Sequence, residues 1–365
     1  MKHGAALAHI RQLCCLALNP EQIMPALLKS LRELVRADSA AFFWVDSRGD
    51  ISDMYAERML PPELMRLYFE RHYESASHSF RTRLIERVRR GELVAEVEPD
   101  DALQRSEYYN QILMPLEAHR ILQGIVRDHG AALGQLSLYR DRRAPAYSAA
   151  DRDNLETAMR YVAHALALPR QAPDTDPSAF QDGDHHALLL CDRRGVVVQA
   201  SHQAHALLAQ VSDVRLGPQT IAGAADQASR RILEPLVRRL EGSERAGTPE
   251  PPKTTVLNAW GRYQLRAYWL GAAASSEGSI GILIQRQEHL LVRLADAMGR
   301  ISLSPQQRET ALLLAQGKTN PEIAEALGVS LNTAHYHVKQ LFNKLDAHGR
   351  GDAVARILEA GALLG

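Results

Sequence analysis

The sequence of 365 residues is poor in the features that mark several classes of protein. Its three cysteines, Cys14, Cys15 and Cys191, form no CxxC pair, which excludes a disulfide framework and a four-cysteine zinc site. No stretch approaches the ~18 to 20 consecutive apolar residues that a membrane-spanning helix needs. Basic and acidic residues number 43 each, so the whole chain offers no net attraction to nucleic acid. We therefore expect a cytoplasmic protein without membrane contact.

The N-terminal run also lacks the marks of a secretory signal. In MKHGAALAHIRQLCCLALNPEQ, His9 and Arg11 interrupt the apolar residues, and no small-residue cleavage site follows. We expect this segment to belong to the mature protein. Unpaired cysteines agree with a reducing cytosol.

The sequence patterns indicate several separately folded units. At roughly 150 residues per domain, its length predicts two or three domains. Apolar periodicity predicts a helix over 20–37 followed by a strand, and a hairpin over 120–140, and a capping pattern at Ser148 starts a further helix. The segment 169–186, PRQAPDTDPSAFQDGDHH, is polar and proline-rich, as is typical of a linker. The first domain is therefore predicted at 1–168.

A second α+β unit is predicted at 187–287. ALLLCD and VVVQAS predict two strands around the turn RRG, helical patterns follow, and KTTVLNAW, RYQLRAYWLGA and SIGILIQRQ predict three more strands. HLLVRLADAMGRI then repeats apolar residues at spacings of three and four, which predicts a connecting helix at 288–301. The remaining unit, 302–365, contains only helical patterns.

The C-terminal unit has strong signals for where its helices begin and end. Ser304 opens an S-x-x-Q capping box, and Asn320, followed by proline, is the predicted cap of the second helix, which ends at Gly328. The third helix is predicted to begin at Ser330 or Asn332. Two compact helices joined by a tight turn that contains glycine form a helix-turn-helix, in which the second helix enters the DNA major groove.

The third helix has two different faces. Its apolar stripe consists of Ala334, Val338, Leu341, Phe342 and Leu345. Its opposite face carries His335, Tyr336, Lys339, Gln340 and Asn343. Such donors and acceptors can read base edges, but they are also typical of a solvated face on a structural three-helix bundle. The acidic and basic residues of the unit balance, although the third helix itself has two lysines and no acid.

The run from Leu303 to Gly361 closely resembles the LuxR-type (GerE) helix-turn-helix domain. It has that family's Leu-Ser/Thr-Pro start, its Asn-x-Glu-Ile-Ala second helix and its Thr-x-x-x-His-x-x-x-Leu/Ile-x-x-Lys-Leu recognition helix. The resemblance implies a DNA-binding transcriptional regulator whose last helix, from Asp352, helps to dimerise. The expected DNA-contacting residues are Asn320, Asn332, Thr333, His335, Tyr336, His337, Lys339, Gln340 and Lys344. Of these, Asn320 and Thr333 are expected at phosphates, and His337 in packing and backbone contact.

The first two units resemble known sensor domains. Residues 1–168 are similar to GAF-like domains, and residues 187–287 look like a PAS domain because ALLLCDRRGVVVQASHQAHALL has the strand, Asp-x-x-Gly turn, strand and helix order with which PAS domains begin. Tyr108 and Tyr109 are either half-buried core aromatics or part of a small-molecule cavity. The histidines His72, His78, His119, His129, His202 and His205 have no spacing distinctive of metal ligands, and no cofactor is required.

The expected fold is therefore multidomain, with two α+β sensor domains followed by an all-α helix-turn-helix domain. The expected function is transcription regulation by a dimer that binds double-stranded DNA, contacts RNA polymerase if it activates, and responds to a signal such as a small-molecule effector. The alternative is constitutive or partner-controlled DNA binding, in which the N-terminal domains only dimerise or bind protein. No Gly-rich phosphate loop, nucleophile elbow or HExxH helix is present, so we expect no enzyme.

Overall fold

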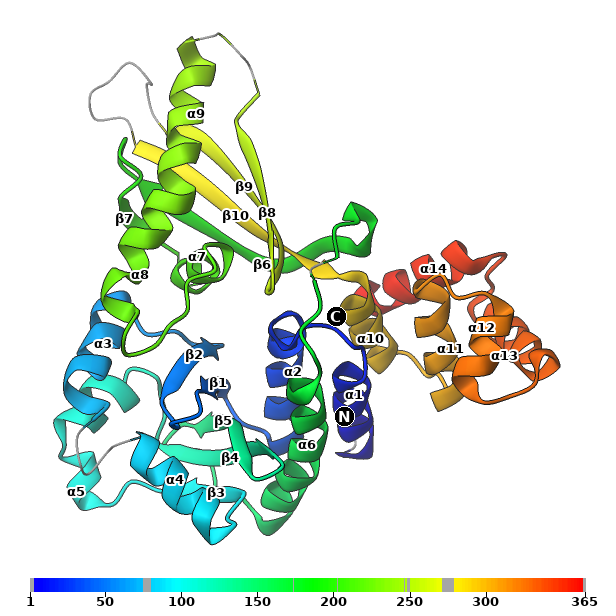
Figure 1. Ribbon diagram of the computed structural model, residues 1–365, viewed down its shortest axis with the longest axis horizontal. Helices are drawn as coiled ribbons and strands as arrows, with labels where there is room; N and C mark the ends of the chain where they lie inside the picture. The colour runs from blue at the N-terminus through cyan, green and yellow to red at the C-terminus, as the bar shows by residue number, and fades with distance from the viewer. Residues whose placement is uncertain are drawn as a thin grey trace.

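The computed structural model describes residues 3–74, 80–172, 174–201, 203–245, 247, 250–270 and 279–363. It consists of two antiparallel five-stranded sheets with their helices, followed by a group of C-terminal helices (Figure 1). This agrees with the expected order of two α+β regions and one helical domain. His78 and His202, which were considered as possible ligands, lie outside the described residues.

The first region contains a sheet in the order β2-β1-β5-β4-β3. Its elements are α1 (His3–Cys14), α2 (Pro20–Val35), β1 (Ser39–Val45), β2 (Ile51–Ala56), α3 (Pro62–Leu67), the π-helical η1 (Tyr68–His72), α4 (Phe80–Arg90), β3 (Val94–Val97), α5 (Asp101–Gln104), the π-helical η2 (Tyr109–Leu113), β4 (Arg120–Asp128), β5 (Ala131–Arg140) and α6 (Ala149–Ala167). The predicted helix over 20–37, the strand after it and the hairpin over 120–140 are confirmed.

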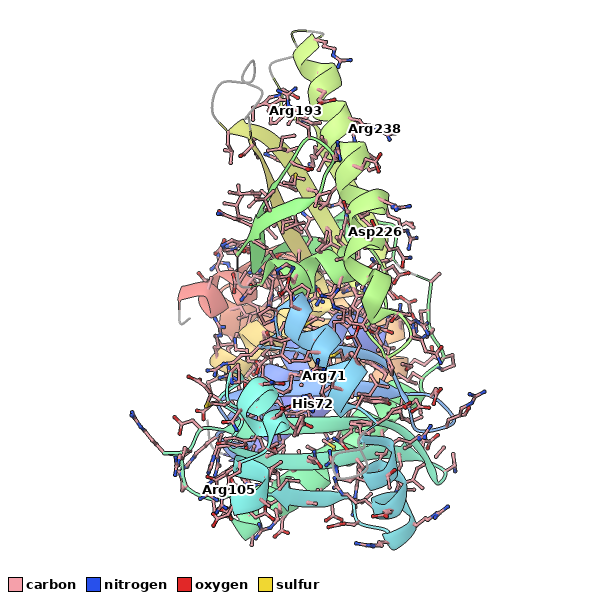
Figure 2. All side chains as sticks on the ribbon, turned by 90° about the vertical axis from the view of Figure 1, so that its left-hand side faces the viewer. Arg71, His72, Arg105, Arg193, Asp226 and Arg238 are labelled. Atoms are coloured by element: carbon pink, nitrogen blue, oxygen red, sulfur yellow. The ribbon has the colours of Figure 1, made fainter. Side chains whose placement is uncertain are left out.

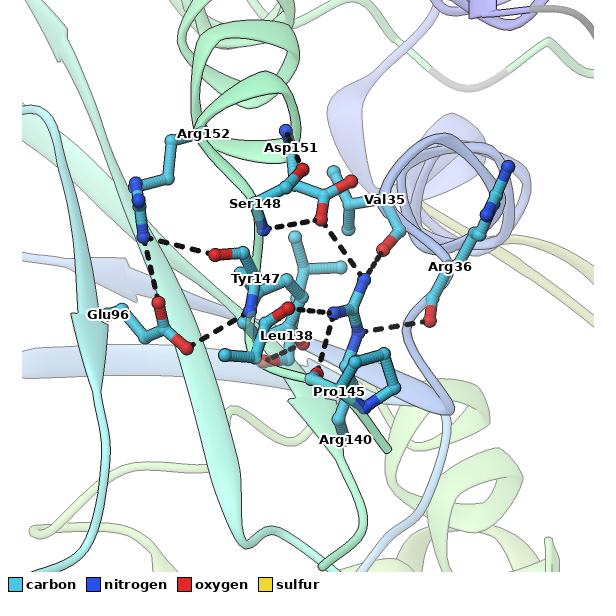
Figure 3. Close-up of polar contacts among 11 residues, drawn as sticks. Val35, Arg36, Glu96, Leu138, Arg140, Pro145, Tyr147, Ser148, Asp151 and Arg152 are labelled. Carbon is cyan, nitrogen blue, oxygen red and sulfur yellow. Dashed lines mark hydrogen bonds and ion pairs between the residues drawn. The ribbon is translucent and has the colours of Figure 1, made fainter. Parts of the chain in front are cut away.

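A buried arginine joins the helices of this region to its sheet (Figure 3). The guanidinium of Arg140, at the end of β5, donates hydrogen bonds to the carbonyls of Val35 and Arg36 at the end of α2, and to two carbonyls in the loop before α6. It also pairs with Asp151 at 3.3 Å and lies 3.9 Å from the centre of the Tyr147 ring. Because the buried charge is matched by so many acceptors, we interpret Arg140 as a structural residue.

The second region contains a sheet in the order β7-β6-β10-β9-β8, the same pattern of strands as in the first. Its elements are the 3-10 turn η3 (Pro177–Ala179), β6 (Phe180–Cys191), β7 (Val197–Ala200), α7 (Ala204–Val211), α8 (Ile221–Ala228), the π-helical η4 (Ser229–Leu233), α9 (Glu234–Arg245), β8 (Lys253–Asn258), β9 (Gly261–Leu270) and β10 (Ser279–His289). The two strands predicted around RRG and the three later strands are present.

The predicted linker 169–186 is wrong in its second part. β6 already begins at Phe180, where the polar residues QDGDHH form its first half. This half pairs with the end of β10, with Phe180 opposite His289 and Asp182 opposite Gln287. A partner strand about a hundred residues away thus determines an extended structure that local composition does not indicate.

The two sheet regions contact each other directly. Trp260, in the turn between β8 and β9, packs against Trp44 and Tyr55 of the first sheet, with ring centroids 5.7 and 5.8 Å apart. Asp53 of β2 accepts a hydrogen bond from the N–H of Leu216 at 3.0 Å. Figure 2 shows the two regions stacked, with Arg193, Asp226 and Arg238 on the second and Arg71, His72 and Arg105 on the first. Many buried apolar side chains of both regions belong to one continuous core, and a second, smaller cluster also contains residues of both.

Helix α10 (Leu290–Arg300) lies within the predicted connecting segment 288–301 and belongs to two cores at once. The side chains in the large core are Leu291, Val292 and Ala295, and those in the C-terminal core are Leu294, Ala297 and Met298. It leads into α11 (Pro305–Ala315), α12 (Asn320–Leu327), α13 (Leu331–Leu345) and α14 (Arg350–Leu363). The C-terminal helices therefore pack against the rest of the molecule through α10 (Figure 1).

Candidate nucleic-acid interface

The C-terminal helices are positioned by capping interactions. Ser304 caps α11 in a complete capping box with Gln307, as its sequence predicts. The prediction that Asn320 caps α12 is wrong, because the cap is Thr319, whose side chain and backbone exchange hydrogen bonds with Glu322. Asn320 is instead the first residue of the helix. A threonine directly before Asn-Pro competes for the cap, and only the backbone geometry decides between them.

A short turn sets the angle between α12 and α13. Gly328 ends α12 in the left-handed conformation, with φ of 64°, which glycine adopts without strain. Ser330 then caps α13 by accepting a hydrogen bond from the N–H of Thr333 at 3.2 Å. Of the two predicted starts of the third helix, Ser330 is the correct one.

The apolar stripe of α13 packs into the C-terminal core as predicted. Ala334, Val338 and Leu341 are buried, and Phe342 and Leu345 pack partly buried at the edge of the same core. The core also takes Ile323 of α12 and Ile357 of α14. Because this stripe fixes the rotation of the helix, the opposite face is turned to solvent.

The predicted DNA-contacting residues differ in their exposure. Those on the exposed face are Asn332, His335, Tyr336, Lys339, Gln340 and Lys344, while Asn320, Thr333 and His337 are partly buried. The side chain of Tyr336 is 59% exposed, which is more than is usual for a tyrosine in a folded protein. Its ring lies 6.0 Å from that of His337. The exposed face thus presents an amide, an imidazole, a phenol and ammonium groups side by side on one helix.

Asn320 is held between three helices. Its amide nitrogen lies 3.3 Å from Nδ1 of His335 on α13, and its oxygen accepts a hydrogen bond of 2.5 Å from Arg350 on α14. Arg350 also donates to the carbonyl of Lys318. Sequence reasoning missed Arg350, since no local pattern links the start of the last helix to the start of the second. These contacts place Asn320 and Arg350 beside α13.

The distribution of ion pairs explains how a neutral unit can present a basic face. Lys318 pairs with Glu322 at 3.8 Å, and Arg356 pairs with Asp352 at 3.0 Å and with Asp346. In the part of the chain that the structure describes, Lys339 and Lys344 of α13 form no ion pair. Their positive charges are therefore available to phosphates, which supply much of the affinity in protein–DNA complexes.

The cap of α13 limits which groups can meet a phosphate at its N-terminus. The hydroxyls of Ser330 and Thr333 lie 2.8 Å apart, and the Thr333 N–H already donates to Ser330. The N–H groups of Leu331 and Asn332 remain directed along the helix axis, where the helix dipole favours an anion. We therefore expect the Thr333 hydroxyl, rather than its N–H, to contact a phosphate.

The rest of the described chain contains few other candidate sites. Among residues with described positions, no group of three or more His, Cys, Asp or Glu side chains could hold a metal ion. No described helix has the length and apolar character to cross a membrane. Tyr108 lines a cavity of about 70 Å³ with Tyr68 and Tyr139. An engineered apolar cavity of about 150 Å³ holds benzene, and this cavity is about half that size. The hydroxyl of Tyr109 instead forms a hydrogen bond of 2.7 Å with Nδ1 of His119.

Comparison with known proteins agrees with the helix-turn-helix geometry. Residues 301–357 match the family described as bacterial regulatory proteins, luxR family. Over 61 residues the chain is 39% identical to the spore germination protein GerE of Bacillus subtilis (strain 168), covering 17% of this chain and 82% of that protein. Over 54 residues it is 46% identical to the probable transcriptional regulatory protein SgaR of Hyphomicrobium methylovorum, covering 15% of this chain and 26% of the relative.

The likeness to these curated relatives covers only a small part of this chain. The chain covers 82% of GerE but only about a quarter of SgaR. Among solved structures, the Vibrio cholera VqmA-ligand-DNA complex is 18% identical over 50% of this chain and 89% of its own, with a TM-score of 0.23. The E. coli DhaR(N)-DhaL complex is 12% identical over 78% of this chain and 90% of its own, also with a TM-score of 0.23. Scores this low support no inference about residues 1–287.

Proposed function

This chain belongs to the luxR family of bacterial regulatory proteins, and from this we propose that it regulates transcription as a dimer under the control of a signal received by residues 1–287. The family membership makes it a DNA-binding regulator rather than an enzyme. The observation that carries the proposal further is the exposed face of α13, which has unpaired lysines and no acidic residue. The cytoplasm, where the DNA lies, is the expected location.

We assign the base-reading role to the middle of α13. His335, Tyr336 and Lys339 lie on the exposed face one turn after the cap, where side chains of a recognition helix meet base edges. Lys344 and the hydroxyl of Thr333 lie towards the two ends of the helix and are assigned to phosphates. Asn320 and Arg350 hold the three helices together beside this surface.

Dimerisation is assigned to the exposed side of α14. One side of this helix is buried against α10 and α11, through Ala353, Ile357 and Gly361. The other side exposes Ala355, Glu359 and Ala362. Ala355 and Ala362, which lie two helical turns apart on this side, are small enough to let a second helix approach closely. We expect a second copy of α14 to pack on this side, which is opposite the contact with α10.

Control by a signal is supported by the way α10 is shared between the two cores. An effector that prefers one arrangement of the sheet regions changes the population of α10 positions, and with it the placement of the two recognition helices of a dimer. In this scheme the two sheet regions act as GAF-like and PAS-like sensors, and their common strand order supports that assignment. RNA polymerase is the expected partner if the protein activates transcription.

The test is operator binding by the full chain. Selection from random duplexes should yield an operator, and Lys339→Ala should weaken binding to it at least about fivefold, because a good base contact contributes ~1 to 3 kcal/mol. Lys253→Ala, which removes an exposed lysine of β8 far from α13, is the control. Unchanged binding by Lys339→Ala, with an unchanged dependence on salt, would contradict the assignment of α13.

A further inference from the structure

A cavity of about 200 Å³ lies where the two sheet regions and α10 meet. The residues that line it include Tyr55 of β2, Gln210 of α7, Arg286 of β10 and Arg300 of α10. No single region encloses it, so its shape depends on how the regions are arranged. At ~30 Å³ per molecule, it has room for about six waters or for one small organic molecule.

The cavity contains a buried cationic donor that lacks a full set of acceptors. Arg286 is 3% exposed, and its guanidinium donates to the carbonyls of Gln22 at 3.2 Å and Trp260 at 3.0 Å. Its Nε has no acceptor within the described chain. Leaving a buried charged donor unpaired is costly, and such groups are rare in folded proteins. An acceptor that reaches this Nε would remove the cost.

A second donor lies in the same wall. Tyr55 is buried, and none of the described residues forms a hydrogen bond with its hydroxyl. Burial raises the pKa of Tyr55 to about 12, so the hydroxyl keeps its proton and acts as a donor. Arg286 and Tyr55 together offer a charged and a neutral donor to one acceptor group, a combination that suits a carboxylate.

Carboxylates of the protein lie in the same cavity. Glu57, directly after β2, has the Nε of Arg32 at 3.3 Å, and Glu288 of β10 has Nδ1 of His185 at 3.2 Å. Burial opposes the charge on Glu288, but the hydrogen bond from His185 and the charge of Arg286 outweigh it and lower the pKa of this carboxyl. Burial raises the pKa of Glu57, against the opposing charge of Arg32, so Glu288 is the more readily ionised of the two. Carboxylates in a partly buried wall attract a cation such as an ammonium group.

We propose that this junction cavity binds a small zwitterion with one carboxylate and one ammonium group, of the size of an α-amino acid. The carboxylate accepts hydrogen bonds from Arg286 and Tyr55, and the ammonium group faces Glu57 and Glu288. The inference rests on the proposed function in one respect only, that the bound molecule is a signal for the DNA-binding domain.

The wall of the cavity leads directly to the C-terminal helices. Arg300 of α10 donates a hydrogen bond of 2.9 Å to the carbonyl of Gly361 on α14. Asp296, one turn earlier on α10, lines the same cavity and accepts from His9 of α1 at 2.9 Å. A ligand that attracts or repels Arg300 and Asp296 therefore acts on the helix that holds the DNA-binding domain.

The test uses the full chain and the twenty standard L-α-amino acids. Isothermal titration calorimetry should show saturable binding of at least one of them, with one molecule per chain. The corresponding deaminated acid and decarboxylated amine should bind at least tenfold more weakly, because each provides only half of the contacts. Failure of all twenty to bind at millimolar concentration overturns the proposal.

Two variants locate the site. Tyr55→Phe removes only the hydroxyl and should weaken amino-acid binding at least fivefold, while Tyr161→Phe, which changes a partly buried tyrosine of α6 outside the cavity, should not. Glu57→Gln should weaken binding of the amino acid more than binding of the deaminated acid, because only the amino acid has the ammonium group that faces Glu57. Equal affinity of wild type and Tyr55→Phe would place the ligand elsewhere. Operator binding, measured on the same samples, separates the two ideas, since it survives if only the ligand proposal fails.

Discussion

Asp53 shows how a single side chain joins the two sheet regions. One oxygen of its carboxylate, Oδ1, accepts hydrogen bonds from the N–H of Met54 at 2.8 Å and from the N–H of Leu216 at 3.0 Å. Burial raises the pKa of this carboxyl to about 6, against the opposing effect of both hydrogen bonds and of Arg215. The contact between the regions therefore includes a partly buried group that titrates just below neutral pH.

The sign of its pH dependence follows from this shift. A carboxyl whose folded-state pKa is raised favours the folded protein below its unfolded pKa near 4, and this contribution is lost as the pH rises through about 6. At neutral pH the buried charge costs on the order of 3 kcal/mol. Asp53→Asn keeps an Oδ1 for both N–H groups and removes the charge. We predict a higher melting temperature at pH 7.5, with a gain that shrinks towards pH 4.5.

The control for this prediction is Asp46→Asn. Asp46 is exposed and also accepts two backbone N–H bonds through Oδ1, from Arg48 and Asp50. Thermal unfolding followed by circular dichroism at both pH values measures the effect. A gain at pH 7.5 that does not shrink at pH 4.5 would show that removal of the buried charge is not the cause.

Two elements show what local sequence can and cannot predict. The helices of the C-terminal unit and the apolar stripe of α13 follow from caps and periodicity, which are local properties. Helix α1 has no such signal, because His9 and Arg11 interrupt its apolar residues. In the structure His9 is buried and pairs with Asp296, 287 residues away. In the sequence, such a buried polar residue looks like an interruption of the apolar periodicity of the helix, because its partner lies far away along the chain.

The candidate sites divide in the same way. The exposed face of α13 was predictable because a helix has a fixed period, and one buried stripe determines the opposite face. The junction cavity was not predictable, since Tyr55, Arg286 and Arg300 come from segments that only the arrangement of the regions brings together. The cap of α12 was predictable only to within one residue. Thr319 and Asn320 can both cap a helix, and the structure has Thr319 in that position.

The contact between α10 and α14 connects the C-terminal helices to the rest of the molecule. A Cβ on Gly361 would lie 2.5 Å from Cβ of Ala297 and 2.7 Å from its Cα. We predict that Gly361→Ala separates the two helices and costs ~1 to 3 kcal/mol, as is usual for overpacking. Hydrogen exchange should then speed up in α10 and α14. Gly351→Ala is a matched control on the same helix, since its Cβ would meet nothing within 4 Å.

For the whole molecule, the two cores and the shared helix determine how a signal can act. Residues of the two sheet regions form one core, so an effector that binds between the regions has to work against the packing of both. Helix α10 contributes to this core and to the C-terminal core, so any shift of α10 changes the position of α13. Packed cores resist continuous deformation, which favours two discrete arrangements over a graded response.

The dimer proposal makes a geometric prediction about the operator. Two recognition helices of a symmetric dimer bind half-sites one DNA turn apart, about 10 to 10.5 base pairs between their centres. Insertion of five base pairs between the half-sites rotates one of them to the opposite side of the duplex, and we predict at least a tenfold loss of affinity for the full chain. Substitution of the same central base pairs without a change in length should have a much smaller effect. Gel-shift titrations, with the stoichiometry measured by analytical ultracentrifugation, test this directly. If one chain per duplex binds with equal affinity at both spacings, α14 does not form a dimer on DNA, and the signal must act on the exposure of α13 within a single chain.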